Sequence, residues 1–474
     1  MEKTKKTLDL TSGPILPLML RFCVPLLLGN LMQQFYNMAD AAVVGHFVGT
    51  EALAAVGATG AITFLIIGFV NGMCAGFCIP VAQAFGAGDE SQLRRCVMNI
   101  TWLGVIFGAV LTVGTSVFLD WLLTAMDFPA DIFADSHIYL RVIFLSIPLT
   151  VAYNVLSGLM QSMGNSRTPL VILVISGLTN VVLDLVTVCL WNWAVFGAAI
   201  ATVAAKLLSV SVALVYLVKN YPVLKTTPEE RRFDGKIAFR LTMSGLPMAL
   251  QYSITAIGSV LIQTAVNGLG SLIVASVTAA NKVQSFVHMP FSTLGVTIST
   301  WCGQNMGAKK YRRIVDGCRT GMWVALIYSV GMGFVMYFGG EYISLIFLDS
   351  GDAQISELLT YLRQFLRGNC IFYIPLGVLT VCRFALQGME HGVTAMFAGF
   401  FEMFARGIVA LVFAKTFGYG AIIYANPAAW FAACVLLVPA CLVVFPKVRR
   451  MLEAQQTEGR TEPTDSLPET AHHA

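Results

Sequence analysis

The chain has 474 residues, of which 57% are hydrophobic and only 12% are charged, and its formal net charge is +4. A soluble domain carries about twice this share of charged residues, so the composition excludes a soluble protein, and the small net charge gives no support to a nucleic-acid partner. Apolar runs close to the ~20 residues that cross a bilayer recur along the chain. We therefore expect an all-α polytopic membrane protein with the lipid bilayer as its surroundings.

Taken in chain order, the apolar runs predict twelve transmembrane helices. Their expected ranges are 15–44, 52–80, 94–119, 137–161, 168–190, 195–218, 240–266, 271–300, 317–346, 358–388, 392–414 and 419–445. Residues 1–14 precede them, 219–239 form a linker after the sixth helix, and 447–474 form a tail. Because the end of this tail is polar and rich in Thr, Glu and Pro, we expect it to be disordered. Prolines at positions 25, 148, 247, 290 and 375 interrupt predicted helices.

Charged residues in the connections orient these helices. Acidic residues gather in the odd-numbered connections, as at Asp127 and Asp131, whereas Lys and Arg gather in the even-numbered ones and beside both ends of the helical region, as at Arg94 and Arg312. Cytoplasmic loops carry an excess of Lys and Arg. Both termini are therefore predicted to be cytoplasmic, which agrees with an even number of spans.

The two halves of the chain match each other at an offset of about 221 residues. The segment 83-QAFGAGDESQLRR-95 follows the second predicted helix and 304-QNMGAKKYRR-313 follows the eighth, so that Gln83 matches Gln304 and Gly86 matches Gly307. An even number of spans separates the copies. This predicts two pseudo-symmetric, parallel six-helix lobes, an N-lobe of residues 15–218 and a C-lobe of residues 240–446. A cavity between two such lobes suits alternating access.

Polar residues form a stripe on the first predicted helix. In 30-NLMQQFYNMAD-40, the amides at positions 30, 33 and 37 share a helical face with Asp40, and on the fifth helix Asn180 and Asp184 lie one turn apart. Ionisable residues are costly in the middle of a bilayer, so they face protein or water. Carboxylates in such a place could take up a proton, and together with an amide oxygen they could bind Na+.

Five blocks of sequence resemble one family when taken together. They are 8-LDLTSGPILPLMLRFCVPLLLGNLMQQFYNMADAAVVGHFVG-49, 51-EALAAVGATGAI-62, 82-AQAFGAGD-89, 161-QSMGNSRTP-169 and 301-WCGQNMGAKKYRR-313. They resemble the multidrug and toxic compound extrusion (MATE) family of secondary transporters, in its bacterial DinF-like and NorM-like forms, over roughly residues 9–446. The resemblance implies a monomeric inner-membrane exporter without a cofactor, which exchanges H+ or Na+ for amphipathic, often cationic, organic compounds.

The resemblance also implies an ion-coupling site. In the DinF-like branch a carboxylate on the first helix and an Asn-x-x-x-Asp pair on the fifth form a cation site in the N-lobe. Asp40, Asn180 and Asp184 match this pattern. We therefore expect these three residues to couple the ion to transport; a hydrogen-bonded packing role is the alternative.

Four further charged residues lie inside predicted helices. Glu402 and Arg406 are spaced i, i+4, which predicts an internal ion pair, with a role in substrate binding or gating as the alternative. Lys206 either neutralises a carboxylate of the N-lobe, in place of a bound cation, or extends along its helix to the membrane surface. Lys282 is expected to pair with a polar group of the C-lobe such as Glu402.

Aromatic, methionine and amide side chains near the predicted cleft could form an adaptable substrate cavity. The candidates are Gln33, Gln34, Tyr36, Asn37, Tyr153, Tyr252 and Met289. For each of them, packing within the protein or against lipid is the alternative.

The sequence also bears on three other functions: a lipid flippase, an ATP-driven pump and an enzyme. A flippase for lipid-linked oligosaccharides or peptidoglycan precursors shares the fold, but it would need more cationic residues in the cleft to hold a pyrophosphate. The sequence contains neither a G-x-x-x-x-G-K-[ST] phosphate loop nor an H-E-x-x-H helix. Neither an ATP-driven pump nor an enzyme is therefore expected, and no catalytic or metal-binding residue is predicted.

Overall fold

The computed structural model describes residues 7–126, 128–345 and 355–461, and nearly all of them are helical. The helices of the first half are α1 (Ile15–Phe47), α2 (Thr50–Ala58), α3 (Gly60–Ala87), α4 (Glu90–Val117), α5 (Leu119–Ala125), α6 (Ala130–Leu145), α7 (Ile147–Ser162), α8 (Arg167–Asp184) with a π-helical continuation (Leu185–Leu190), and α9 (Ala194–Asn220). A short 3-10 turn (Pro222–Leu224) lies in the linker.

The second half repeats this sequence of elements. Its helices are α10 (Gly235–Asn267), α11 (Ser271–Gly307), α12 (Tyr311–Ser344), α13 (Ile355–Cys370), α14 (Tyr373–Gly388), α15 (Gly392–Ile408) with a π-helical continuation (Val409–Phe413), α16 (Ala414–Phe417) and α17 (Tyr419–Thr461).

The prediction of an all-α polytopic membrane protein is confirmed. Among the described residues, nine helices are long and apolar enough to cross a membrane, and two bent pairs, α6 with α7 and α13 with α14, raise the number to eleven. The remaining long helix, α11, is 37 residues long but lacks a stretch as apolar as those of the other spans. Counting it as a span gives the twelve that the sequence predicts.

The structure corrects two details of the predicted helices. The fourth and tenth spans are not continuous but bend by 47° and 50°, where Pro148 and Pro375 lie in the first turn of α7 and α14. A proline cannot donate the helical hydrogen bond and its ring crowds the preceding turn. Pro25, Pro247 and Pro290, by contrast, lie inside unbroken helices. The tail is also more ordered than predicted, because α17 continues to Thr461; residues 462–474 lie outside the described residues.

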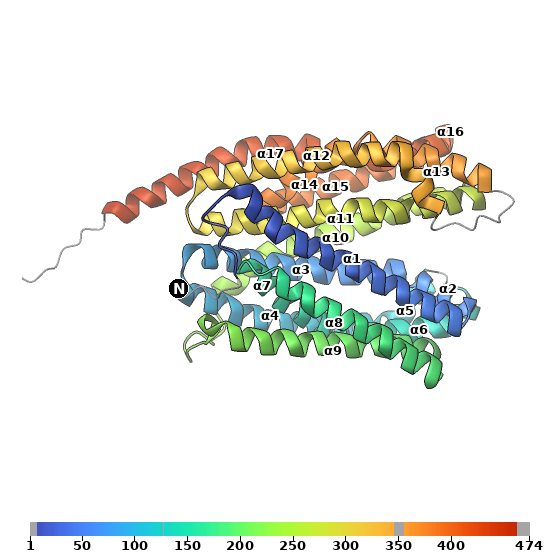
Figure 1. Ribbon diagram of the computed structural model, residues 1–474, viewed down its shortest axis with the longest axis horizontal. Helices are drawn as coiled ribbons and strands as arrows, with labels where there is room; N and C mark the ends of the chain where they lie inside the picture. The colour runs from blue at the N-terminus through green and yellow to red at the C-terminus, as the bar shows by residue number, and fades with distance from the viewer. Residues whose placement is uncertain (1–6, 127, 346–354, 462–474) are drawn as a thin grey trace, which may run out of the picture.

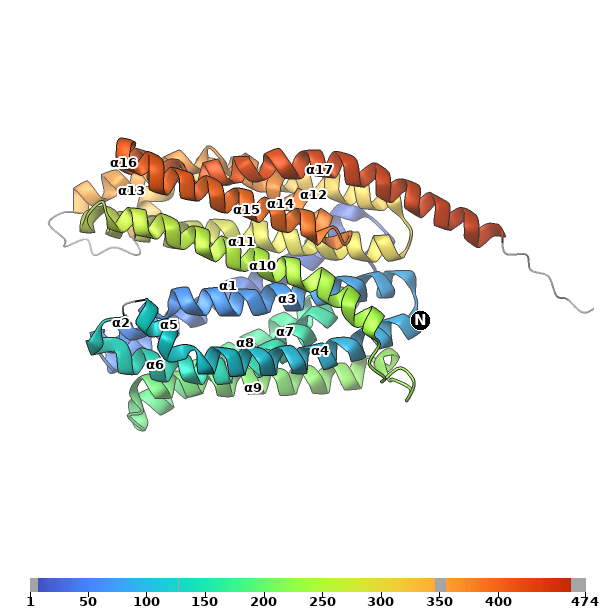
Figure 2. The same ribbon diagram turned by 180° about the vertical axis from the view of Figure 1, so that it is seen from behind.

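The two halves form two lobes that lie side by side, α1 to α9 in one and α10 to α17 in the other (Figure 1). Each lobe has its own apolar core, around Phe77 and Phe144 in the first and around Trp301 and Tyr373 in the second. Where the lobes meet, α3 packs along α10 and α11. The same arrangement is visible from behind in Figure 2.

The lobes contact each other closely at the end of the bundle where residue 7 and the last turns of α17 lie, which we call the closed end (Figure 1). A Cβ atom added to Gly86 would collide with the backbone oxygen of Gln304, and one added to Gly307 would collide with the backbone oxygen of Gln83. These are the residues that match in the sequence repeat, and each glycine allows the backbone of the other lobe to approach. The closed end is thus built from two reciprocal contacts.

Matched glutamines add hydrogen bonds to the same contact. The Nε2 of Gln304 donates to the backbone oxygen of Ser162 at 2.8 Å, and the Nε2 of Gln83 donates to the backbone oxygen of Gly388 at 3.5 Å. Each glutamine thus reaches from its own lobe to the last turn of α7 or its counterpart α14 in the other. Both lobes therefore contribute the same parts to the closed end.

The segment before α1 crosses this closed end. The backbone N–H of Leu8 donates to the oxygen of Gly164 in the first lobe at 3.1 Å, whereas the N–H of Leu10 donates to Oε1 of Gln304 in the second at 3.2 Å. Arg313 donates to the backbone oxygen of Leu10 at 3.0 Å. Leu10 itself is fully buried. Residues 7–13, which we call the strap, therefore tie the two lobes together.

The linker between the lobes is attached to α4 through Glu230. The Nε of Arg94 donates to its carboxylate at 2.8 Å and the backbone N–H of Thr227 donates to the same oxygen at 3.0 Å. These hydrogen bonds, that from Arg94 first, lower the pKa of Glu230 from 4.5 to about 2. The ionised carboxylate is thus favoured in the folded protein.

We expect the contribution of Glu230 to stability to be present above pH 4.5 and to be lost as the pH falls from 4.5 to about 2. The folded state holds this proton less readily than the unfolded state, so acid favours unfolding. In detergent, the melting temperature of the wild type should therefore fall more steeply with acidification than that of Glu230→Gln. Parallel curves for the two proteins would contradict the assignment.

Candidate functional site

Asp40, Asn180 and Asp184 come together between α1 and α8. The two helices pack along each other, and Tyr36 of α1 lies against Gly177 of α8, where an added Cβ would lie 3.2 Å from its ring. This close packing brings the carboxyl groups of Asp40 and Asp184 within hydrogen-bonding reach of each other. The residues expected to couple the ion thus form one cluster.

The cluster lacks hydrogen-bond donors. Asp184 is fully buried and Asn180 is 3% exposed. In the described part of the chain, no donor reaches the two carboxylate oxygens of Asp184, Oδ1 of Asp40 or Oδ1 of Asn180, and no acceptor reaches Nδ2 of Asn180. Buried carboxylates without a donor or counter-charge are strongly unfavourable. Because Asp184 is such a group and is in contact with the half-buried Asp40, the pair favours binding of a proton or a metal cation.

The backbone changes directly after this cluster. At Leu185 the α-helical turns of α8 widen to a π-helix, and in the second lobe α15 changes in the same way at Val409. π-Helical turns in α-helices are rare and occur frequently at functional sites. The second lobe has no carboxylate at the corresponding place, because Arg406 and Ala410 stand where Asn180 and Asp184 stand in the first.

Lys206 is hydrogen-bonded within the first lobe. Its ammonium group donates to Oγ1 of Thr150 on α7 at 3.1 Å, and no ion pair found among residues 7–126, 128–345 and 355–461 joins it to Asp40 or Asp184. A direct ion pair between this lysine and the carboxyl pair is therefore not present among the described residues. Lys206 is held instead by a neutral partner on the neighbouring helix.

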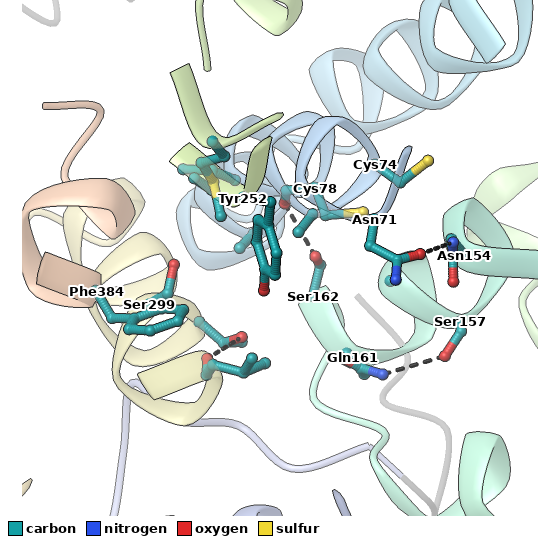
Figure 3. Close-up of a pocket in the computed structure, with 17 residues that line it drawn as sticks. Asn71, Cys74, Cys78, Asn154, Ser157, Gln161, Ser162, Tyr252, Ser299 and Phe384 are labelled. Atoms are coloured by element: carbon teal, nitrogen blue, oxygen red, sulfur yellow. Dashed lines mark hydrogen bonds between the residues drawn. The ribbon is translucent and has the colours of Figure 1, made fainter. Parts of the chain in front are cut away.

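A cavity of about 170 Å³ lies between the lobes, above the closed end. Its walls come from α3 and α7 on one side and from α10, α11 and α14 on the other, as Figure 3 shows. Asn154 donates to Asn71 at 2.6 Å on the first side, whereas Tyr252 and Phe384 contribute rings from the second. The lining contains no Asp, Glu, Lys, Arg or His among the described residues.

Only one predicted cavity residue, Tyr252, lines this cavity. The remaining candidates are Gln33, Gln34, Tyr36, Asn37, Tyr153 and Met289, and none is among the lining residues. Gln33 and Asn37 are exposed, and Met289 on α11 is 9% exposed. Helical spacing showed which residues share a face but not which way that face is turned.

The polar residues that do line the cavity were not predicted. They include Asn71, Asn154, Ser157, Gln161 and Ser299. Gln161 belongs to one of the sequence blocks that carry the family resemblance, which was the available signal. Asn154 and Ser157 share a helical face with Gln161 at i, i+3 and i+7, a second signal that could have been used, whereas Asn71 and Ser299 lie in apolar runs without such a pattern.

The second lobe holds a buried cluster of charges that the sequence revealed only in part. Glu402, which is 3% exposed, forms a hydrogen-bonded ion pair with Arg383 of α14. Arg406 lies 3.8 Å from its other oxygen, as the i, i+4 spacing predicted. Arg383 was not predicted to take part. Lys282 is exposed on α11, and the expectation that it pairs with Glu402 is wrong, since Arg383 occupies that place.

These features define a polytopic helical membrane protein with a cavity between two lobes. The MatE family model matches residues 25–186 and 247–412, one stretch in each half. The chain therefore belongs to the MatE family, that is, the MATE family of multidrug efflux transporters, and the resemblance in the sequence is confirmed.

Known proteins agree with this assignment. The chain is 28% identical over 346 residues to the probable multidrug resistance protein YoeA of Bacillus subtilis (strain 168), which covers 71% of this chain and 75% of the relative. It is 25% identical over 396 residues to the probable multidrug resistance protein YpnP of the same organism, with 82% and 85% covered. A solved structure described as the outward-facing conformation of a multidrug resistance MATE family transporter has the same fold, with a TM-score of 0.84, 21% identity, and 96% and 100% covered.

Proposed function

We propose that this transporter exchanges H+ or Na+ for amphipathic, often cationic, organic compounds by alternating access, with Asp40, Asn180 and Asp184 as the ion-coupling site. The observation that carries the proposal is the contact between the carboxyl groups of Asp40 and Asp184, of which Asp184 is fully buried without a donor and Asp40 is half-buried. Two adjacent carboxylates cannot both stay ionised in such a place without a cation. The site must therefore load and release a positive charge as water reaches it.

Helix α1 connects this site with the other lobe. Asp40 lies on α1, and on the same helix the Nδ2 of Asn30 donates to Oγ1 of Thr293 on α11 at 3.2 Å. Binding a cation removes the repulsion between α1 and α8 at Asp40. A resulting shift of α1 would be felt at the contact between the lobes, which is the coupling that antiport requires.

The cavity supports extrusion of organic compounds rather than the flipping of pyrophosphate-linked lipids. Its lining combines amide and hydroxyl groups with the rings of Tyr252 and Phe384, a surface that suits molecules with both polar and apolar parts. A site for a pyrophosphate would be expected to carry several Lys or Arg side chains, and the described lining has none.

We further propose that the closed end faces the cytoplasm of a bacterial-type inner membrane. The first described residues of the chain and the last turns of α17 lie on this side (Figure 1). Lys309, Lys310, Arg312 and Arg313 lie there as well, which agrees with the excess of Lys and Arg in cytoplasmic loops. The structure then corresponds to an outward-facing state. Each chain contains both walls of the cavity, so we expect the transporter to work as a monomer.

Transport of a cationic dye in reconstituted vesicles tests the coupling. With a pH gradient or a Na+ gradient imposed separately, we expect one gradient to drive dye accumulation by the wild type. Asp40→Asn and Asp184→Asn should reduce it to the level of vesicles without protein, because an amide cannot bind the proton and holds a cation only weakly.

Asp131→Asn is the matched control, since Asp131 is an exposed carboxylate at the start of α6, and it should leave transport unchanged. Dye accumulation that persists in both amide variants, or that no gradient drives, would overturn the proposal.

A further inference from the structure

A groove of about 530 Å³ opens between α1, α8 and α9 beside the closed end. It is distinct from the cavity between the lobes and shares no lining residue with it. The strap forms one rim through Thr7 and Leu8, and the first turns of α8 form the opposite wall. Its position at one end of membrane-spanning helices places it at the level of lipid headgroups.

The end of the groove near the termini is positively charged. Arg21 of α1 and Arg167 at the start of α8 line it, both are exposed, and no carboxylate is among the described lining residues. Neither arginine forms an ion pair with another described residue. The N-terminus of α8 adds partial positive charge at the same place through its helix dipole.

A buried hydroxyl in this wall has no partner. Ser166, the residue before the first turn of α8, is 1% exposed and lines the groove, yet its Oγ makes no hydrogen bond within the described part of the chain. It does not cap its own helix; the neighbouring Asn165 does so instead, accepting from the N–H of Thr168 at 3.1 Å. A free hydroxyl, two guanidinium groups and a helix N-terminus together form a site for a phosphate group.

The groove becomes apolar away from these charges. Arg167, Val171 and Ile175 follow one face of α8 at i, i+4 and i+8, so the wall changes from charged to aliphatic over about 12 Å. Val171 is 55% exposed and Ile175 is 45% exposed, and Val212 of α9 lies on the other side. A soluble phosphate compound would not use this wall, whereas an acyl chain would cover it.

We propose that this groove binds an anionic membrane phospholipid, with its phosphodiester between Arg21, Arg167 and the N-terminus of α8 and one acyl chain along Val171 and Ile175. The excess of Lys and Arg on one side of the membrane accounts for exposed cations, but not for a buried hydroxyl without a partner inside a walled groove. A bound headgroup would also contact Thr7 and Leu8, so the lipid would hold the strap in place at the closed end. The inference does not rest on the proposed ion coupling.

Native mass spectrometry of the purified full chain tests the site, with phosphatidylglycerol and phosphatidylcholine titrated separately. We expect the wild type to retain phosphatidylglycerol in preference to phosphatidylcholine, and Arg21→Gln/Arg167→Gln to weaken phosphatidylglycerol binding about thirtyfold, since each cation near the surface contributes to anionic lipid binding. Arg95→Gln/Arg232→Gln removes two exposed cations elsewhere at this end and should leave binding unchanged. Equal binding in the three proteins would overturn the proposal.

Two measurements on the wild type keep the test independent of folding in the variants. Inorganic phosphate at millimolar concentration should fail to displace the lipid; displacement would mean that the groove takes free phosphate and that the apolar wall plays no part. A phosphatidylglycerol with a photoactivatable group on its acyl chain should label α8 or α9 near Val171 and Val212. Labelling confined to other helices would contradict the assignment.

Discussion

Replacing Gly86 with alanine is expected to reduce dye transport about tenfold or more. The new Cβ would collide with the backbone oxygen of Gln304, and this oxygen cannot rotate away as the end of a side chain could. Overpacking of this kind costs about 1–3 kcal/mol, and each 1.4 kcal/mol changes a population about tenfold. Since the contact exists only while this end is closed, the cost falls on the closed state and the transporter would remain open on that side.

The two reciprocal contacts provide a second variant and a control. Gly307→Ala should have the same effect, because its Cβ would collide with the backbone oxygen of Gln83 in the reciprocal contact. Gly114→Ala is the control, since Gly114 lies inside α4 with no atom within 4 Å of an added Cβ. Energy transfer between dyes placed at Ser91 and Arg312, exposed residues of the two lobes, should report a longer distance in the first two variants only. An unchanged distance in Gly86→Ala would contradict this account.

Glu402→Gln is expected to lower the free energy of unfolding by about 3–5 kcal/mol. Its carboxylate lies between two guanidinium groups, of Arg383 and Arg406, which are 8% and 6% exposed. Without the carboxylate, two buried positive charges face each other with no counter-charge, which is the costly way to break a buried ion pair. Chemical unfolding in detergent, followed by circular dichroism, measures the change.

Glu341→Gln offers a matched comparison at an exposed pair. Arg363 donates to both oxygens of Glu341 at 2.6 and 2.8 Å, but its side chain is 44% exposed, so removing the charge should cost no more than about 1 kcal/mol. If the two substitutions changed stability equally, the cluster around Glu402 would not act as a buried charge network. Glu402→Gln/Arg383→Gln should recover part of the loss, because one of the two uncompensated cations is removed as well.

The sequence was sufficient for the architecture because spans and repeats are properties of the chain itself. Apolar length predicted the helices, and the matching of Gly86 with Gly307 predicted two equivalent lobes. It could not show that these glycines meet the other lobe, since close approach of two backbones leaves no trace in composition. The two bent spans have prolines at the break, but prolines at 25, 247 and 290 leave their helices continuous, so proline alone does not predict a bend.

Of the residues in the two charged clusters and the cavity, some could be predicted from the sequence and others could not. The spacing of Glu402 and Arg406 along one helix could be read directly, whereas Arg383, on a neighbouring helix, could not be connected with them. The juxtaposition of Asp40 and Asp184 was expected only through family resemblance, because 144 residues separate them. The lining of the cavity between the lobes could be predicted least, because it depends on how each helix is rotated about its axis, which is decided by packing between helices.

The strap imposes an order on biosynthesis. Leu10 is hydrogen-bonded to Gln304, Asn305 and Arg313, which leave the ribosome about 300 residues after it. At ~5–20 residues per second, translation needs roughly 15–60 s to supply them. During that interval the strap cannot form its hydrogen bonds to the second lobe. The first lobe of the nascent protein must therefore stay in the membrane without these contacts, and the closed end can form only after α12 has begun to emerge.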